Sequence, residues 1–122
     1  MLRIAGGVLL AAFVVVATPV AGEEDFPIVG AYWRDLACKG DGASRPDLLV
    51  RITPQQIQSD MGECRILNRK RAGKAFLVHV ECKIAGGALV LGDVTFTMRD
   101  GTTLDFEDQD HTSDATLYKC SG

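Results

Sequence analysis

Residues 64–82 read CRILNRKRAGKAFLVHVEC, and this stretch decides the fold because its two cysteines stand at equal distances from Gly73. After the glycine, Phe76, Val78 and Val80 occupy every second position, a period of two that is typical of a half-buried β-strand. Two residues that face each other on neighbouring strands of a β-hairpin lie at equal distances in sequence from the turn between the strands. We therefore predict a β-hairpin that a disulfide closes across its strands.

The register of this hairpin follows from placing the two cysteines opposite each other. The predicted pairs are Cys64 with Cys82, Ile66 with Val80 and Asn68 with Val78. Both thiols then share the apolar face. Facing residues of neighbouring antiparallel strands have Cβ atoms about 4.5–5.5 Å apart, which is close to the separation that a disulfide requires.

A second hairpin is predicted over residues 92–108, GDVTFTMRDGTTLDFED, where Asp100 and Gly101 separate two alternating runs. With a three-residue loop that begins at Arg99, the glycine takes the left-handed conformation. The predicted pairs are Phe96 with Leu104 and Val94 with Phe106. In this register the apolar faces of the two strands agree.

Three further segments are expected to be strands: IVGAYW at 28–33, LLVRIT at 48–53 and ATLYKC at 115–120. The segment 53–62, TPQQIQSDMG, is ambiguous, because Thr53 could cap a short helix or could begin a turn before an edge strand. We favour the strand, since every neighbouring element is β. Short strands joined by tight turns predict an all-β domain, a small antiparallel meander barrel or sandwich with two disulfides.

The first 22 residues have the order of a secretory signal peptide, with Arg3 followed by an apolar run at 8–17 and small residues. A retained membrane anchor is the alternative, since residues 4–21 are just enough to span a bilayer. We favour removal. The mature protein is then a single domain, residues 23–122, which is periplasmic or secreted and has no membrane span.

All four cysteines lie in this exported part, and an even number there is typical of two disulfides. There is no C-x-x-C pair and neither histidine has a zinc-ligand spacing, so no metal is predicted. In an up-and-down meander the first and last strands can meet, and a bridge from Cys38 to Cys120 would fasten that seam. We therefore pair Cys38 with Cys120 and Cys64 with Cys82, although two other connectivities are formally open.

The net charge of the chain is −3, and removal of the segment that contains Arg3 makes it −4, which argues against nucleic acid as a partner. The sequence has no nucleophile elbow, phosphate loop or H-E-x-x-H helix, so we expect neither enzymatic activity nor a cofactor. His79 falls on the polar side of its strand without an evident carboxylate partner. We expect Trp33 to be buried as a plug of the core.

The acidic stretch 105–114 partly follows the pattern of a calcium loop. Asp108, Asp110, Thr112 and Asp114 match the first four ligand positions. Ser113, however, stands where the turn glycine belongs, and Lys119 where the bidentate glutamate belongs. We therefore interpret this stretch as a solubilising loop.

The strongest candidate for a binding surface is the basic tip of the first hairpin. We define the basic tip as Arg65, Arg69, Lys70, Arg71 and Lys74. A covalently closed hairpin loses less entropy when it binds, and its charge suits an acidic envelope component or a protein partner with an acidic groove. The ordinary alternative is that a solvated loop tip needs polar residues. We expect the protein to be a monomer.

The mature chain resembles small exported four-cysteine proteins of Gram-negative bacteria that have no assigned activity. The resemblance rests on these segments, in order: YW with a following cysteine, ITPQQI, ECRI, HVEC, LDF and YKC. Periplasmic protease inhibitors are similar in outline: they are small barrels that open with Gly-x-Trp, comparable with GAYW here, and EEDFPIVG corresponds to their inhibitory segment. Periplasmic lysozyme inhibitors end in a Tyr-x-Cys strand, like Tyr118 and Cys120. We expect a non-catalytic binding module, and the similarity to the two inhibitor families makes hydrolase inhibition one possible form of it. A structural or stress-related envelope role with no single ligand is the alternative.

Overall fold

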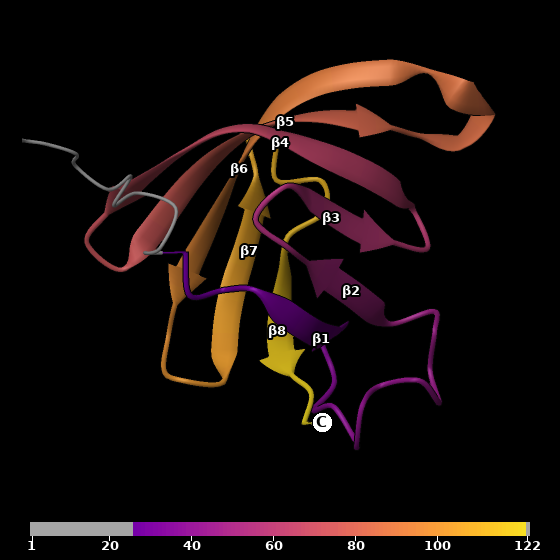
Figure 1. The fold of residues 1–122 in the computed structure, drawn as a ribbon, viewed down its shortest axis with the longest axis vertical. Coiled ribbons are helices and arrows are strands. Elements are labelled where there is room, and N and C mark those ends of the chain that lie inside the picture. The colour runs from indigo at the N-terminus through magenta and orange to yellow at the C-terminus, as the bar shows by residue number, and fades with distance from the viewer. Residues whose placement is uncertain (1–25, 122) are drawn as a thin grey trace, which may run out of the picture.

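The computed structural model describes residues 26–121 and shows a closed antiparallel β-barrel (Figure 1). The strands are β1 (Gly30–Arg34), β2 (Leu49–Ile52), β3 (Gln56–Ser59), β4 (Gly62–Ala72), β5 (Ala75–Lys83), β6 (Leu89–Met98), β7 (Thr103–Asp108) and β8 (Ala115–Lys119), with a short 3₁₀ turn η2 (Ala85–Gly87). The predicted all-β meander is confirmed, and it is a barrel. The predicted signal peptide, residues 1–22, lies outside the described residues.

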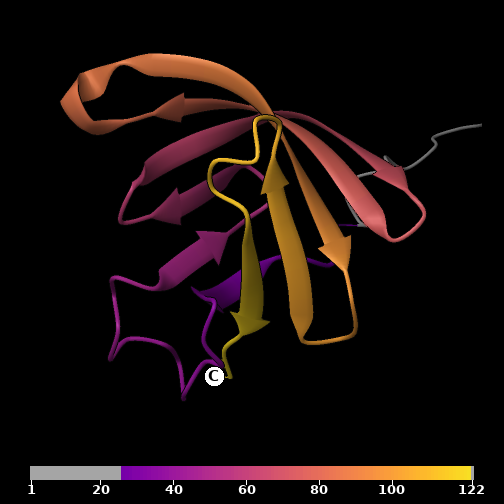
Figure 2. The same ribbon diagram turned by 180° about the vertical axis from the view of Figure 1, so that it is seen from behind.

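Each strand pairs with the next along the chain, and β8 returns to pair with β1, where Trp33 lies opposite Tyr118. Figures 1 and 2 show this circuit from opposite sides, with the hairpin of β5 and β6 extending beyond the rest of the wall. Closure leaves no strand unpaired along a whole side, which removes the template that a full edge strand offers to another chain.

The hairpin of β4 and β5 confirms part of the predicted register and corrects the rest. Cys64 lies opposite Cys82, and Ile66 lies opposite Val80. The register then shifts between Ile66 and Asn68, so that Asn68 faces His79 and not Val78. An extra residue in one strand is a β-bulge, which reverses the faces of the residues beyond it. Arg69 and Arg71 consequently lie opposite the buried residues Val78 and Phe76, on the inner face of the barrel.

The hairpin of β6 and β7 has a longer loop than predicted. Its pairs are Met98 with Leu104, Phe96 with Phe106 and Val94 with Asp108, which corrects both predicted pairs. The Asp100 carboxylate accepts hydrogen bonds from the backbone N–H and the hydroxyl of Thr102, so the turn continues through Thr102. Gly101 does not have the left-handed conformation that we predicted. The register differs by two residues, so the apolar faces still coincide.

The ambiguous segment 53–62 contains the predicted strand, β3. Thr53 does act as a cap, because its hydroxyl oxygen accepts hydrogen bonds from the N–H groups of Gln55 and Gln56. A turn and not a helix follows, and Ile57 then pairs with Cys64 in the adjacent strand.

Both predicted disulfides are present, Cys38–Cys120 and Cys64–Cys82. The first joins the loop after β1 to the end of β8, as expected for a bridge across the closing seam. Next to it, the backbone N–H of Ser121 donates to the carbonyl oxygen of Gly40. Two disulfides are typical of a protein that folds in an oxidising compartment outside the cytoplasm. Among residues 26–121, no helix is long and apolar enough to cross a membrane.

Trp33 is 2% exposed, but it is not a plug of the barrel core. Its neighbour Tyr32 belongs to the core cluster, and alternation along β1 therefore places Trp33 on the outer face. The loop between β1 and β2 covers the indole, whose Nε1–H donates to the carbonyl oxygen of Gly42 at 2.9 Å. Inside the barrel, the Tyr32 hydroxyl donates to the carbonyl oxygen of Ile28, and burial raises the pKa of Tyr32 to about 12.

Candidate ligand-binding site

One end of the barrel is closed by aromatic and basic side chains. Phe26 packs edge-on against Phe76, with ring centroids 5.5 Å apart. The Arg69 guanidinium lies 4.6 Å from the centroid of the Phe26 ring and donates to the carbonyl oxygen of Pro54. Arg71 lies over the Phe76 ring. The bulge in β4 therefore uses two arginines to cover the apolar residues at this end.

The opposite end opens into a cavity of about 520 Å³. Its lining includes the ends of β1, β5 and β7, the turn between β3 and β4, and the start of β8. This volume falls within the range of about 300–1,000 Å³ that is typical of small-molecule sites. An eight-stranded barrel is also just wide enough to enclose one small ligand when side chains do not fill it.

The cavity exists because the inner residues near this end are small. Gly92 lies opposite the buried Val80, which places it on the inner face. A Cβ atom at Gly92 would meet only the Gln109 side chain, at 3.7 Å. Ala115 and the Cys64–Cys82 disulfide also line the cavity. No bulky side chain from these positions fills the space.

The cavity wall and its rim are mainly apolar. The half-buried residues Ile57 and Phe106 pack against the core and line the cavity. Phe106 also contacts Phe96, with ring centroids 5.3 Å apart. Four large hydrophobic residues line the cavity while remaining exposed at its rim: Met61, Ile84, Val90 and Leu91. Contiguous apolar surface of this kind typically marks a binding site.

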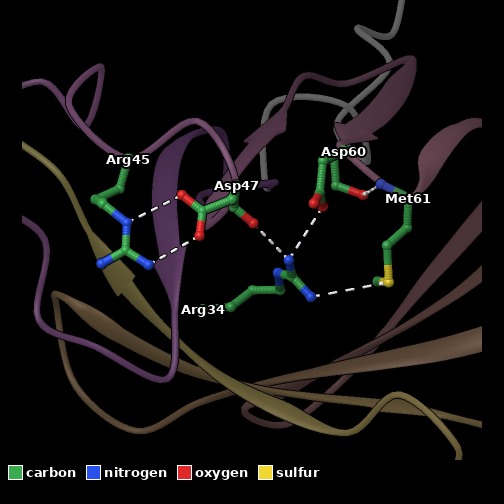
Figure 3. Close-up of polar contacts among 6 residues, drawn as sticks. Arg34, Arg45, Asp47, Asp60 and Met61 are labelled. Atoms are coloured by element: carbon green, nitrogen blue, oxygen red, sulfur yellow. Dashed lines mark hydrogen bonds and ion pairs between the residues drawn. The ribbon is translucent and has the colours of Figure 1, made fainter.

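Arg34 is a basic residue of the cavity lining, and contacts from two loops fix its position (Figure 3). Alternation along β1 places it on the same inner face as Tyr32. One terminal nitrogen donates to the Asp47 carbonyl oxygen at 2.6 Å and to the Asp60 carboxylate at 3.0 Å. The other contacts the sulfur of Met61. The side chain is 25% exposed, so this ion pair is partly shielded from water.

The Nε atom of Arg34 is buried and has no hydrogen-bond partner, the one such side-chain nitrogen or oxygen in residues 26–121. A buried donor without an acceptor typically costs about 1–3 kcal/mol. The Arg34 guanidinium therefore has a donor that the surrounding protein atoms enclose without satisfying.

The charges around the opening are predominantly negative. The acidic residues of the lining are Glu63, Asp93, Asp108 and Asp110, of which Asp93 turns its carboxylate to the outer face, and the basic residues are Arg34 and Lys83. Hydrogen bonds from the Thr112 hydroxyl and the Ser113 N–H hold the pKa of Asp108 below its usual value. The first residue of the partial calcium pattern thus has a structural use, since it orders the loop between β7 and β8.

The basic tip lies at the closed end, away from the cavity lining, and much of its charge has partners within the fold. Arg65 forms an ion pair with Glu81 at 2.8 Å. Arg69 and Arg71 cover aromatic rings, and the Arg71 Nε–H also donates to the Gly73 carbonyl oxygen. Lys70 and Lys74 are the other two members. Binding at this surface stays a prediction.

His79 has a carboxylate partner that the sequence did not reveal. Its Nδ1 atom lies 2.7 Å from the carboxylate of Asp93, the residue that faces it on β6. The earlier expectation that His79 lacks such a partner is therefore wrong. The reason is that the partner comes from a strand pairing and not from a spacing within one segment. Both side chains are exposed on the outer face.

In the acidic loop, the ligand atoms of Glu107, His111 and Asp114 lie within 4.8 Å of one another, and all three residues are exposed. The His111 Nδ1 atom lies 2.8 Å from the Asp114 carboxylate. Hydrogen bonding to Asp114 and its negative charge raise the pKa of His111 above its ordinary value.

We expect Asp114→Asn to lower the pKa of His111 towards its ordinary value. Protonated His111 is favoured in the folded state, so this contact stabilises the fold below the unfolded pKa of about 6.5, and the contribution disappears as the pH rises through the folded pKa. An NMR titration of the imidazole protons in both proteins measures the difference. Equal pKa values of His111 in the two proteins would contradict the assignment.

Comparisons of the chain with protein-family models, with curated proteins and with solved structures find no match. The cavity and the contacts of Arg34 are the features of the candidate site that sequence reasoning missed. One signal was present: Gly92 stands two positions before Val94 on the alternating face that continues to Phe96, so a position of the core face lacks a side chain.

Proposed function

We propose that the protein is a periplasmic or secreted, non-catalytic binding module, and that its binding site is the cavity at the open end of the barrel. The observation that carries the proposal is an apolar cavity of about 520 Å³ that opens between exposed hydrophobic residues. A small apolar molecule would replace water in the cavity and cover part of the rim, and burial of apolar surface is the main driving force for such binding.

The covalent structure supports this proposal. The Cys64–Cys82 bridge is part of the cavity wall, and the Cys38–Cys120 bridge fastens the seam where the barrel closes. A site built on a cross-linked wall is ordered before the ligand arrives, so binding loses less conformational entropy. Hydrolase inhibition and recognition of an acidic envelope component by the basic tip stay separate predictions, as does the structural envelope role.

Gly92→Phe tests the cavity as the site. The substitution fills the space from β6, where the backbone conformation is ordinary and an added Cβ atom meets only Gln109. The uncharged dye N-phenyl-1-naphthylamine, whose fluorescence rises in apolar surroundings, is the probe. We expect wild-type protein to enhance the dye's fluorescence, and the variant to bind it at least about tenfold more weakly, since ring and dye compete for one space.

The matched control is Gly101→Phe, which places the same ring at an exposed turn with no atoms nearby. This variant is expected to bind the dye as wild type does. Equal dye affinity in Gly92→Phe and wild type would refute the cavity as the site, as would the absence of any enhancement by wild-type protein.

A further inference from the structure

We infer that the protein forms a symmetric dimer in which residues Leu89–Leu91 of two copies pair as antiparallel strands. We define these residues as the free edge of β6. The inference goes beyond the proposed function and does not depend on it, because it concerns the pairing of a strand and not the contents of the cavity. The dimer replaces the monomer that we expected from the sequence.

The free edge exists because β6 is longer than its neighbour β7. On one side, β6 pairs with β5 from Leu89 to Thr97. On the other side, β7 ends at Asp108, which lies opposite Val94. Residues 89–92 of β6 therefore have a neighbouring strand on one side only. Figures 1 and 2 show the hairpin of β5 and β6 extending beyond the rest of the wall here.

The backbone groups of Leu89 and Leu91 point towards the side that has no neighbouring strand. Along an antiparallel pair, residues that exchange backbone hydrogen bonds alternate with residues that do not. The Ile84 N–H donates to the Ala88 carbonyl oxygen across the hairpin. Alternation from this pair directs the backbone groups of Val90 towards β5 and those of Leu89 and Leu91 away from it.

Gln109 marks the place where the pairing of β6 with β7 ends. Its backbone N–H donates to the carbonyl oxygen of Asp93, and its side-chain oxygen accepts from the Asp93 N–H at 2.8 Å. Asp93 therefore directs its backbone groups to the same side as Leu89 and Leu91. Beyond Gln109 this side of β6 has no strand beside it, and an unpaired row of backbone groups is a template for another strand.

The side chains of the free edge favour pairing with another chain. Leu89, Val90 and Leu91 are 64%, 47% and 61% exposed. No residue in the range 84–92 has a charged or polar side chain. Exposed edges of natural sheets usually have a lysine, a proline or a bulge that blocks such pairing. The free edge of β6 is apolar and has none of these, so we expect another strand to cover it.

A second copy of the chain fits the free edge because this edge is complementary to itself. When Val90 of both copies lies at the two-fold axis, Leu89 of each copy lies opposite Leu91 of the other. The outward backbone groups of both leucines then find partners. Alternation places Leu89 and Leu91 on one face, so the leucines of both copies form a single apolar cluster. The hairpin tip of each copy, which comes nearest to Gln109 of the other, is Gly86 and Gly87 and has no side chains there.

Two other occupants fit the free edge less well. In the hydrocarbon of a bilayer, the outward backbone groups of Leu89 and Leu91 would lose water and gain no partner. An unrelated extended peptide could pair with these groups, but the chain offers no charged or polar side chain in 84–92 that would select one peptide over another. A second copy matches the edge by symmetry and is present at the protein's own concentration.

Sedimentation equilibrium of the oxidised wild-type protein tests for the dimer. The contact is smaller than the standard interface of about 1,200–2,000 Å², so we expect reversible association with a Kd of about 100 µM or tighter. A wild-type protein that remains monomeric at about 1 mM overturns the inference. Flotation of such a monomer with phosphatidylcholine vesicles would make the bilayer the occupant instead.

A pair of charged variants tests whether the free edge is the interface. Leu89→Glu/Leu91→Glu and Leu89→Lys/Leu91→Lys are each expected to be monomeric, because like charges face each other across the two-fold axis. An equimolar mixture is expected to form a heterodimer, since opposite charges then face each other. Dimerisation of either variant alone, or a monomeric mixture, contradicts the inference. Thermal unfolding checks that both variants are folded.

Leu77→Lys is the matched control, because Leu77 is a 47% exposed leucine of β5 that is distant from the free edge in the strand pairing. This variant is expected to dimerise as wild type does. Amide hydrogen exchange then locates the interface: the N–H groups of Leu89 and Leu91 should become protected as the protein concentration rises, while that of Val90 is protected by β5 at every concentration. A dimer without this change at Leu89 and Leu91 uses another surface and overturns the inference.

Discussion

Replacement of Cys38 and Cys120 with alanine is expected to lower the free energy of unfolding by about 4.5 kcal/mol. The two residues are separated by 82 positions, and the chain-entropy estimate for a loop of that length gives about this value. The loss is large compared with the ~5–15 kcal/mol that stabilises a typical domain. Chemical denaturation of the oxidised wild-type protein and the variant measures it.

The same variant should also expose Trp33. The bridge fixes the loop that covers the indole, and Gly42 in that loop approaches so closely that an added Cβ would lie 2.9 Å from Trp33 Nε1. Without the bridge we expect a red shift of tryptophan emission before global unfolding. The matched control is the double alanine variant of Cys64 and Cys82, whose separation of 18 predicts a loss of only about 3 kcal/mol and no such shift. The reverse order of the two losses would contradict this account.

Phe96→Ala is expected to destabilise the barrel by about 3–5 kcal/mol, the usual cost of removing a fully buried phenylalanine. Phe96 is 0% exposed, packs against Phe106 and belongs to both the core cluster and the cavity lining. Its removal takes away contacts on both sides and leaves space that the rigid closed wall cannot fill. Urea denaturation at a fixed pH provides the measurement.

Leu91→Ala is the control for Phe96→Ala. Leu91 is 61% exposed on the rim, so its truncation should change the free energy of unfolding by less than about 0.5 kcal/mol. A loss below about 1 kcal/mol for Phe96→Ala, or equal losses for both variants, would show that the core is not organised around Phe96.

The architecture was predictable because it depends on local alternation and on covalent chemistry. Period-two patterns around Val78 and Phe96 indicated half-buried strands, and the spacing of Cys64 and Cys82 about Gly73 indicated their pairing. The second bridge followed from the expectation that a meander brings its first and last strands together. These features require no knowledge of distant contacts beyond the order of the strands.

The registers were less predictable because small backbone irregularities decide them. The residue between Ile66 and Asn68 has no signature that distinguishes a bulge from regular strand, yet it moves Arg69 and Arg71 to the inner face. The loop at Asp100 was lengthened by hydrogen bonds to Thr102, which compete with the shorter turn that Asp-Gly favours.

The cavity could not be predicted because it is a property of all eight strands together. Gly92, Ala115 and Ile57 come from separate elements, and only the closed barrel brings them to one end. Arg34 likewise looks like an ordinary polar residue after an aromatic pair. Its position depends on Asp47 and Asp60, which reach it from other loops. Neither the cavity nor the set of contacts around Arg34 corresponds to a residue spacing that could be recognised in the sequence.

The covered end at Phe26 and Phe76 has a kinetic consequence. A ligand would enter and leave the cavity through the same opening, so an incoming ligand could not displace the bound one from the opposite end. The rate of ligand exchange would then be set by the dissociation rate of the bound ligand, at any concentration of the incoming ligand. Such a protein would release its ligand slowly unless an acceptor protein, or a movement of the loops at the opening, increased the dissociation rate.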